Sequence, residues 1–284
     1  MSYTKPIFTL SKSDAATAGG KGASLGEMTN AGIPVPPGFV VTAAAFDLYV
    51  QSDQFDSLLQ AEILSAFDNL DCDFVAVRSS ATVEDGVSAS WAGELETYLN
   101  TTRENLLENI EKCWRSLWSE RAIAYRNEHH LRSTKISVAV VVQKMIQSDV
   151  SGITFTVHPV TKDPDSMIIE ACWGLGELIV GGEVTPDSYT VRKSDLAILD
   201  VYQNDQEEML IRNSVIPAQA GIQCVLVPVP SADRSQRKLS DDQVRALAST
   251  CVTIENHYGF PCDIEWAIEN GKLFILQSRP ITTL

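Results

Sequence analysis

Four polar side chains near the end of the chain could bind a metal ion and a phosphate together. They occupy alternate positions in two short runs, Asp263-Ile264-Glu265-Trp266 and Gln277-Ser278-Arg279-Pro280. Carboxylate and amide oxygens suit Mg²⁺, which commonly binds through one or two carboxylates together with phosphate oxygens. Arginine supplies a planar fork of donors that matches a phosphate group. These side chains therefore predict a site for a metal-bound polyphosphate, provided that they lie on one face.

The two runs form the arms of a predicted β-hairpin whose turn can be drawn in two ways. Asn270-Gly271 between apolar-rich runs is a strong hairpin signal. A two-residue loop pairs residues 269 and 272 and puts Glu265 and Gln277 on opposite faces, because side chains alternate along a strand. A three-residue loop, with Gly271 left-handed, pairs 268 with 272 and gathers all four side chains on one face. We adopt the three-residue loop. Instead of binding a metal ion and a phosphate, the four side chains could form a ladder of surface salt bridges on a solvated hairpin face.

A glycine-rich segment near the start of the chain supplies a second candidate for phosphate binding. The run Gly19-Gly20-Lys21-Gly22 leads into a short helix that is expected to stop at Gly32. Backbone N–H groups and a lysine at the start of a helix attract anionic phosphate. The segment is not a P-loop, because Ala15 stands where that motif needs glycine and Gly22 where it needs serine or threonine. Plain chain reversal is the alternative interpretation.

Arg78 is a third candidate, at the end of a strand expected over residues 74–78. Hydroxyl residues follow it, so the arginine could hold a phosphate, and an ion pair with Glu84 or Asp85 is the alternative. Residues 86–93 are mostly small and surround a single tryptophan. A loop of this kind can close over a ligand with its amides facing inward.

Composition restricts the class of protein. The chain has 284 residues, of which 44% are apolar, enough for one two-lobed domain or two smaller ones. A net charge of −15 without a basic run argues against nucleic acid or an anionic membrane as a partner. The six cysteines include no Cys-x-x-Cys spacing, which argues against a zinc site or a redox dithiol. Without an apolar leader or a long apolar run, we expect a cytoplasmic location.

The chain alternates helices with closely spaced strands. Residues 136–146 form a β-branched run, expected as a strand buried on both faces, and the strand density over 136–203 predicts an antiparallel sheet. Residues 204–238 match no catalytic pattern and are expected to be a surface excursion.

Two capping boxes predict where two helices begin. The box formed by residues 101 and 104 should open one long amphipathic helix that ends near His129. The box of residues 240 and 243 should open a helix that runs to Tyr258 and stops at Gly259.

Taken together, these segments resemble a known domain family. Six motifs follow in the family's order: Gly19-Gly20-Lys21-Gly22-Ala23, Val77-Arg78-Ser79-Ser80-Ala81-Thr82, Ala92-Gly93 with Thr97-Tyr98-Leu99-Asn100, Val142-Gln143-Lys144-Met145, Glu170-Ala171 with Trp173-Gly174-Leu175-Gly176-Glu177, and the two runs of the tail hairpin. This order is similar to that of the N-terminal ATP-grasp domain shared by phosphoenolpyruvate synthase, pyruvate phosphate dikinase and rifampicin phosphotransferase. The match spans nearly the whole chain.

The resemblance implies an α+β fold, a two-lobed ATP-grasp domain with antiparallel sheets and flanking helices. Residues 1–140 would form the N-terminal lobe and residues 141–284 the C-terminal lobe, with Mg-ATP held between them. In this family ATP is split to AMP, and its β-phosphate passes to a histidine on a separate domain.

The resemblance also implies roles for the site residues. Arg279, Lys21 and Arg78 would contact the phosphates and act in catalysis, while Glu265 and Gln277 would hold Mg²⁺ with Asp263 nearby. The adenine would lie against Gln143, Lys144 and Met145. A loop would cover the triphosphate, formed by Ser88, Ala89, Ser90, Trp91, Ala92 and Gly93.

One part of the family pattern is missing. None of the histidines at positions 129, 130, 158 and 257 stands in the phosphohistidine motif. We therefore expect the phosphohistidine domain on a missing segment or a separate chain, so that this chain binds ATP without completing the reaction alone. Pyruvate is the favoured final acceptor, ahead of a rifampicin-like antibiotic and of pyruvate with phosphate as co-substrate. The other hypothesis is an inactive relic that serves as a binding or regulatory domain, although the retained charged residues argue against it.

Overall fold

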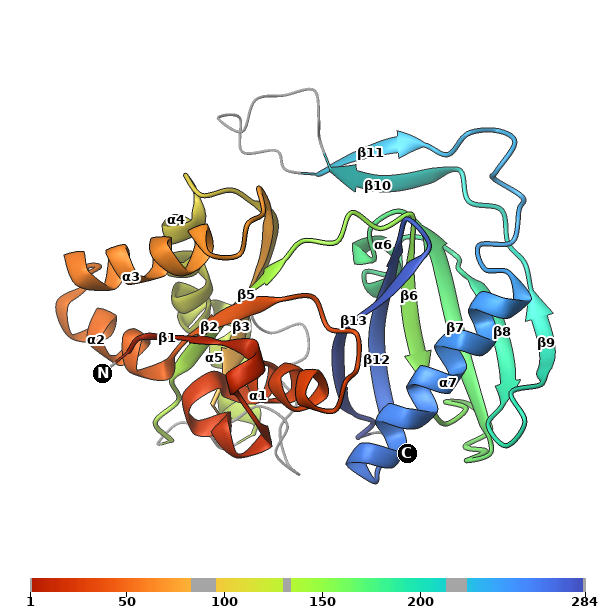
Figure 1. Cartoon of the computed structure of the whole chain (residues 1–284), viewed down its shortest axis with the longest axis horizontal. Coiled ribbons are helices and arrows are strands. Elements are labelled where there is room, and N and C mark those ends of the chain that lie inside the picture. The colour runs from red at the N-terminus through yellow and green to blue at the C-terminus, as the bar shows by residue number, and fades with distance from the viewer. Residues whose placement is uncertain (1, 83–95, 130–133, 213–223, 283–284) are drawn as a thin grey trace. The chain divides into compact units, whose positions relative to one another are not determined.

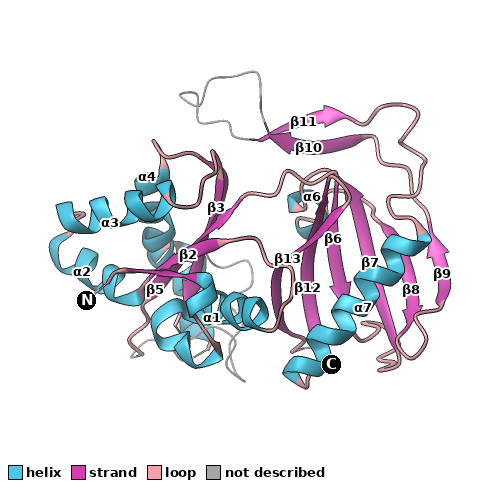
Figure 2. Ribbon diagram, viewed as in Figure 1, coloured by secondary structure: helices cyan, strands magenta, loops and turns pink. Residues whose placement is uncertain are grey.

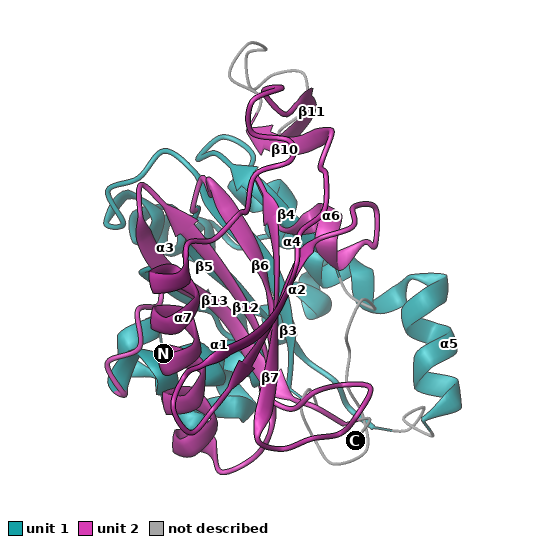
Figure 3. Cartoon of the chain, turned by 90° about the vertical axis from the view of Figure 1, so that its right-hand side faces the viewer, with its two compact units in different colours: residues 1–30, 36–145 teal, residues 31–35, 146–284 magenta. Residues whose placement is uncertain are grey.

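A computed structural model describes residues 2–82, 96–129, 134–212 and 224–282 (Figure 1). The chain divides into two compact units (Figure 3). Unit 1 comprises Met1–Asn30 and Pro36–Met145, and unit 2 comprises Ala31–Val35 and Ile146–Leu284. In the described ranges, no helix has the length and apolar character needed to cross a membrane.

Unit 1 is built on a five-stranded antiparallel sheet with the order β1-β2-β5-β3-β4. Its strands are β1 (Thr4–Pro6), β2 (Gly38–Val41), β3 (Val75–Ala81), β4 (Thr97–Thr101) and β5 (Val138–Lys144). The central strand β5 is fully buried from Val138 to Val142. The prediction of a β-branched strand covered on both faces is therefore confirmed.

The helices of unit 1 cover both faces of this sheet. In the part of unit 1 that the structure describes, they are α1 (Ala15–Asn30), α2 (Ala43–Ser52), α3 (Ser57–Asp68), α4 (Leu106–Arg115) and α5 (Glu120–Glu128), with short 3-10 turns at Ile7–Thr9, Lys12–Asp14 and Ser116–Trp118. Helix α1 approaches one face closely, because a Cβ on Gly22 would lie 3.0 Å from Val40 and 3.7 Å from Val141. The other face forms the main core with side chains that include Phe46 and Trp114.

The single long helix predicted from residue 101 to His129 is wrong. The Asn105 side chain accepts a hydrogen bond from the backbone N–H of Thr102 at 2.7 Å, and α4 begins only after it. A 3-10 turn then interrupts the helix, and Ser119 caps α5 anew through Ala122. Because of this break, Trp118 is 47% exposed instead of joining the core.

Unit 2 contains a six-stranded sheet in which every neighbouring pair is antiparallel, with the order β13-β12-β6-β7-β8-β9. Its strands are β6 (Val150–Phe155), β7 (Ser166–Trp173), β8 (Asp187–Arg192), β9 (Ile198–Tyr202), β12 (Cys262–Glu269) and β13 (Lys272–Pro280). The predicted antiparallel sheet over residues 136–203 is thus confirmed for β6 to β9, whereas residues 138–144 form β5 in the sheet of unit 1. With flanking helices on both sheets, the expected α+β class is confirmed as well.

Among the described residues of unit 2, helices α6 (Glu177–Val180) and α7 (Asp241–Tyr258) accompany this sheet. Figure 2 shows α7 lying across the sheet, and its apolar side is fully buried, including Leu247 and Cys251. The predicted capping box is present at Ser240, and the helix ends at Gly259 with φ 74°. Both predicted ends of α7 are therefore confirmed.

Residues 204–238 are not the plain surface excursion that we expected. They contain an antiparallel pair, β10 (Glu208–Arg212) and β11 (Cys224–Pro228), while residues 213–223 lie outside the described part. Near the two ends of this segment, Gln206 is 1% exposed and Lys238 is 3% exposed. We call residues 204–238 the arm.

Candidate functional site

The tail hairpin turns through two residues, so the predicted three-residue loop is wrong. Glu269 pairs with Lys272, and Asn270 and Gly271 have φ values of 51° and 74°. Two successive left-handed residues form the tight turn that Asn-Gly favours between antiparallel strands.

A β-bulge nevertheless brings the polar side chains together. Trp266 pairs with Ile275 while Glu265 pairs with Gln277, so Leu276 is an extra residue in β13. A bulge shifts the pairing by one residue and so reverses which side chains share a face. Glu265 therefore lies opposite Gln277, and Asp263 lies opposite Arg279.

Asp263 and Arg279 form an ion pair across these strands. Both Nε and one terminal nitrogen of the guanidinium donate to Oδ2 of Asp263, at 2.9 and 2.6 Å. Burial raises the pKa of Asp263, and the charge and hydrogen bonds of Arg279 offset this only in part. The carboxylate thus fixes the direction in which the arginine fork points.

A third carboxyl group, that of Glu170 in β7, lies on the same face of the sheet. Ile153 pairs with Glu265 on one side and with Glu170 on the other, and directly paired residues share a face. Burial raises the pKa of Glu170, as does the charge of Asp263. The sequence analysis placed Glu170 in a motif but gave its side chain no role. Its signal was an acidic residue inside the otherwise apolar run of β7.

These groups offer oxygen ligands without forming a closed metal cage. In the described ranges, no group of three or more His, Cys, Asp and Glu side chains is placed to hold a metal ion. The cross-strand pair of Glu265 and Gln277 offers a carboxylate and an amide side by side. Such a pair suits Mg²⁺, which keeps most of its positions for water and phosphate oxygens.

In unit 1, a break in α1 positions Lys21. Gly19 has φ 70° and ψ 173°, so Lys21 stands in the first turn after the break. The Ser80 hydroxyl donates to the carbonyl of Ala18 at 2.9 Å and accepts from the N–H of Gly22 at 3.2 Å. Ser80 thereby joins α1 to β3, the strand that carries Arg78.

The segment predicted to contact adenine, residues 143–145, is hydrogen-bonded to its neighbours in unit 1. The buried side-chain amide of Gln143 donates to the carbonyl of Pro36 at 3.3 Å. The backbone N–H groups of Lys144 and Met145 donate to other carbonyls, at 2.8 and 3.0 Å. The predicted covering loop, Ser88 to Gly93, lies outside the described residues.

The predicted site residues thus fall into two groups. Lys21, Arg78 and residues 143–145 belong to unit 1, and the four hairpin residues, Asp263, Glu265, Gln277 and Arg279, belong to unit 2. The contacts given above for each group lie within that group's own unit. That both groups bind one ligand remains a prediction.

Comparison with known proteins identifies relatives for the whole chain. The family described as pyruvate phosphate dikinase, AMP/ATP-binding domain, matches residues 15–73 and 50–284. The chain is 40% identical to a probable phosphoenolpyruvate synthase of Methanocaldococcus jannaschii, over 100% of the chain and 27% of that protein. It is 38% identical to the phosphoenolpyruvate synthase of Pyrococcus furiosus, over 99% of the chain and 44% of that protein. The chain therefore spans less than half the length of these relatives.

Among solved structures, the D-alanine-D-alanine ligase of Helicobacter pylori is 12% identical and covers 89% of this chain and 51% of its own, with a TM-score of 0.40. A score of this size carries no argument about function.

Proposed function

Because the chain belongs to the family of pyruvate phosphate dikinase AMP/ATP-binding domains, we propose that it binds Mg-ATP and acts in phosphoryl transfer as part of a phosphoenolpyruvate synthase-like enzyme. One observation carries this proposal: Glu265 faces Gln277 next to the Asp263–Arg279 ion pair. This face offers oxygens for a divalent cation and a guanidinium for a phosphate.

The residues of unit 2 would act on the polyphosphate. Glu265 and Gln277 would hold Mg²⁺, which offsets the negative charge of the phosphates when it is bound. Arg279, oriented by Asp263, would stabilise charge that develops on the transferred phosphoryl group.

The residues of unit 1 would complete the nucleotide site. Lys21 and Arg78 would bind phosphate oxygens, residues 143–145 would lie against adenine, and residues 88–93 would cover the triphosphate. This requires that the two lobes of an ATP-grasp domain, expected over residues 1–140 and 141–284, correspond to the two units.

The acceptor of the phosphoryl group would bind outside the nucleotide-site residues named above. We infer that ATP is split to AMP and that its β-phosphate passes to a phosphohistidine domain and then to pyruvate. The relatives described above are named as phosphoenolpyruvate synthases, which favours pyruvate over a rifampicin-like antibiotic. An inactive relic that only binds nucleotide is the other candidate, and the retention of every charged residue of the predicted site argues against it.

Equilibrium binding tests the nucleotide site. Titration of the chain with ATP should show binding that depends on Mg²⁺, and Glu265→Ala and Arg279→Ala should each weaken it about tenfold or more, as expected when a charged contact is lost. Arg192→Ala is a matched control, because Arg192 lies in the same sheet but pairs with Asp195. Absence of Mg²⁺-dependent binding would rule the proposal out.

Transfer is tested separately from binding. ATP labelled at its β-phosphate is mixed with this chain and a phosphohistidine domain of a phosphoenolpyruvate synthase. Label on the histidine supports the enzymatic function, whereas binding without transfer supports the relic.

A further inference from the structure

Glu170 lies without a partner on the face of the unit 2 sheet that carries the four hairpin side chains. It is partly buried, and neither a hydrogen bond nor an ion pair joins its carboxyl group to another residue in the part of the chain that the structure describes. Its neighbours across the strands are Ile153 in β6 and Ser188 in β8. Ile168 and Cys172, which stand two residues away on the same face of β7, are buried. A carboxyl group without a donor in such surroundings is destabilising, and groups of this kind mark candidate functional sites.

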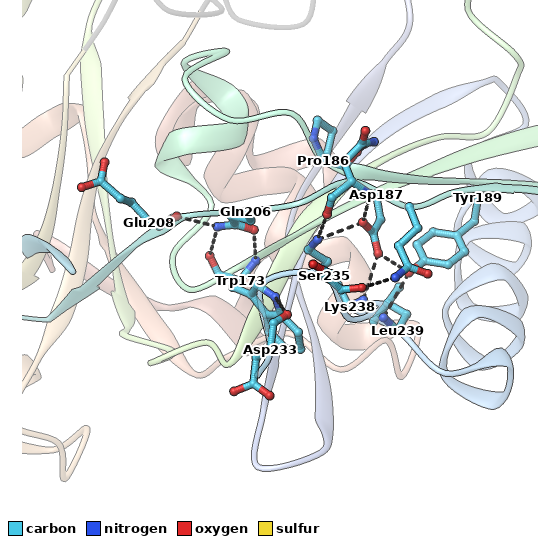
Figure 4. A network of polar contacts seen from close by, with 12 residues as sticks. Trp173, Pro186, Asp187, Tyr189, Gln206, Glu208, Asp233, Ser235, Lys238 and Leu239 are labelled. Carbon is cyan, nitrogen blue, oxygen red and sulfur yellow. Dashed lines mark hydrogen bonds and ion pairs between the residues drawn. The ribbon is translucent and has the colours of Figure 1, made fainter. Parts of the chain in front are cut away.

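The strand that carries Glu170 is held at its end as well as along its length. The Gln206 side chain accepts from the backbone N–H of Trp173 at 2.8 Å and donates to the carbonyl of the same residue at 3.1 Å (Figure 4). The neighbouring strand β8 begins at Asp187, whose buried carboxylate accepts from Lys238 Nζ at 2.9 Å (Figure 4). Because β7 is also paired with β6 and β8, the carboxyl group is presented from a firmly held strand, as a group that orients a ligand must be.

The charges around Glu170 indicate which kind of ligand suits it. Burial raises the pKa of Glu170, and the charge of Asp263 raises it further, so Glu170 lies near the ion pair of Asp263 and Arg279. In the proposed function, Arg279 acts on the phosphoryl group that is transferred. A carboxylate repels phosphate oxygens, so Glu170 needs a donor that arrives beside them. The acceptor histidine supplies one, because a neutral imidazole carries one N–H and one nitrogen with a free lone pair.

We propose that Glu170 orients the phosphoryl acceptor by accepting a hydrogen bond from the N–H of its imidazole. This inference rests on the proposed phosphoryl transfer and assigns Glu170 a role in it. The hydrogen bond fixes which ring nitrogen keeps its lone pair. That lone pair forms the bond to the β-phosphorus, the bond from this phosphorus to the oxygen that bridges to the α-phosphate breaks, and AMP leaves with the electron pair. The γ-phosphate stays attached, and the carboxylate stabilises the positive charge that the protonated ring gains.

Transfer kinetics test the inference. ATP labelled at its β-phosphate is mixed, in a single turnover, with this chain and a phosphohistidine domain of a phosphoenolpyruvate synthase. Glu170→Ala should slow labelling of the histidine about tenfold or more, as when a positioned charge is lost in catalysis. The affinity for Mg-ATP should change by less than about twofold, because no contact with the nucleotide is removed. Glu170→Gln keeps an oxygen that accepts the same hydrogen bond, so it should be slowed less than Glu170→Ala.

Stability and a matched control separate this role from a structural one. Glu170→Gln should keep or raise the melting temperature, because it removes a partly buried charge that has no donor. If Glu170→Ala does not fold, slower transfer by Glu170→Gln at an unchanged melting temperature carries the test. Asp200→Asn is the control, because Asp200 is exposed on the edge strand β9, opposite Thr190. It removes one negative charge from the same sheet, away from the hairpin, and its transfer rate should match that of the wild type.

The other outcomes are distinct from one another. Equal transfer rates in the wild type and Glu170→Ala would overturn the inference and leave the proposed function standing. A higher Mg²⁺ requirement in Glu170→Ala would make Glu170 a metal ligand, and weaker binding of ATP but not of 3′-deoxy-ATP would make it a ribose contact. Either result would overturn the inference as well. Failure of the wild-type chain to transfer the label would instead refute the proposed phosphoryl transfer.

Discussion

The Ser80 hydroxyl bridges the break in α1, since it accepts from the N–H of Gly22 and donates to the carbonyl of Ala18. Two sequence motifs that lie about sixty residues apart thus meet at one side chain. The glycines that resembled a phosphate loop are therefore also required for packing, because a Cβ on Gly19 would lie 2.2 Å from the carbonyl oxygen of Ser80.

Gly19→Ala should destabilise unit 1 by about 3 kcal/mol or more. A left-handed backbone costs a side-chain residue about 1–2 kcal/mol, and here the new methyl group would also collide with the backbone of β3. Gly32→Ala is the control, because Gly32 has φ 78° but nothing within 4 Å of its Cβ position. It should cost only about 1 kcal/mol. Urea unfolding measures both, and equal losses would show that the contact with Ser80 does not matter.

Lys238→Met should destabilise unit 2 by about 3–5 kcal/mol, because it leaves the carboxylate of Asp187 buried without its cation. The double variant Asp187→Asn with Lys238→Met removes the uncompensated charge and should be more stable than Lys238→Met alone. Thermal unfolding of the two single variants and the double variant gives the coupling between the residues. If the losses of stability in the two single variants simply add up in the double variant, the two residues are not tightly coupled.

The parts of the fold that the sequence predicted were those with local signals. Helix α7 has a capping box and a terminal glycine, and β5 is a run of β-branched residues. The bulge at Leu276 had no such signal. Pairing of β12 with β6 is regular from Asp263 to Ile268, so the irregularity is confined to β13, at the edge of the sheet. Edge strands accept bulges readily, and the hydrophobic pattern alone did not reveal this one.

The grouping of the four hairpin side chains was thus predicted correctly from a wrong turn. The assumed three-residue loop and the observed bulge each shift the register by one residue, in opposite directions, and either shift puts the four side chains on one face. Only the bulge brings Glu265 directly opposite Gln277, because the assumed loop pairs Glu265 with Ile275. The arm was missed for another reason. Its anchors, Gln206 and Lys238, bond to residues 33 and 51 positions away, and no periodicity in the sequence reports such a contact.

Glu62→Gln should weaken the attachment of β1 at neutral pH by about 1 kcal/mol, the typical worth of such a hydrogen bond. One carboxylate oxygen of Glu62 accepts from Ser2, Tyr3 and Thr4 at 2.6–2.9 Å. Burial raises the pKa of Glu62, but these hydrogen bonds outweigh it, so the pKa lies below its ordinary value of 4.5.

The sign of the pH dependence follows from this lowered pKa. The unfolded chain takes up the proton first as the pH falls, so the stabilising contribution is complete well above 4.5 and is lost as the pH drops through the folded-state pKa. The difference in unfolding free energy between wild type and Glu62→Gln should therefore shrink in acid. A difference that stays constant between pH 7 and pH 3 would contradict the assignment.

Asp263→Asn distinguishes a carboxylate that orients Arg279 from one that binds the metal ion. Asparagine keeps an oxygen near the guanidinium but loses the charge that holds it, so Arg279 should point less uniformly at the phosphate. We expect Mg²⁺-dependent ATP affinity to change by less than about threefold, while transfer to a phosphohistidine domain slows about tenfold or more, as when a positioned charge is lost in catalysis. Glu265→Gln should instead raise the Mg²⁺ concentration that is needed for half-maximal ATP binding. If Asp263→Asn shifts that titration as strongly as Glu265→Gln does, Asp263 is a metal ligand, and its hydrogen bonds to Arg279 are secondary.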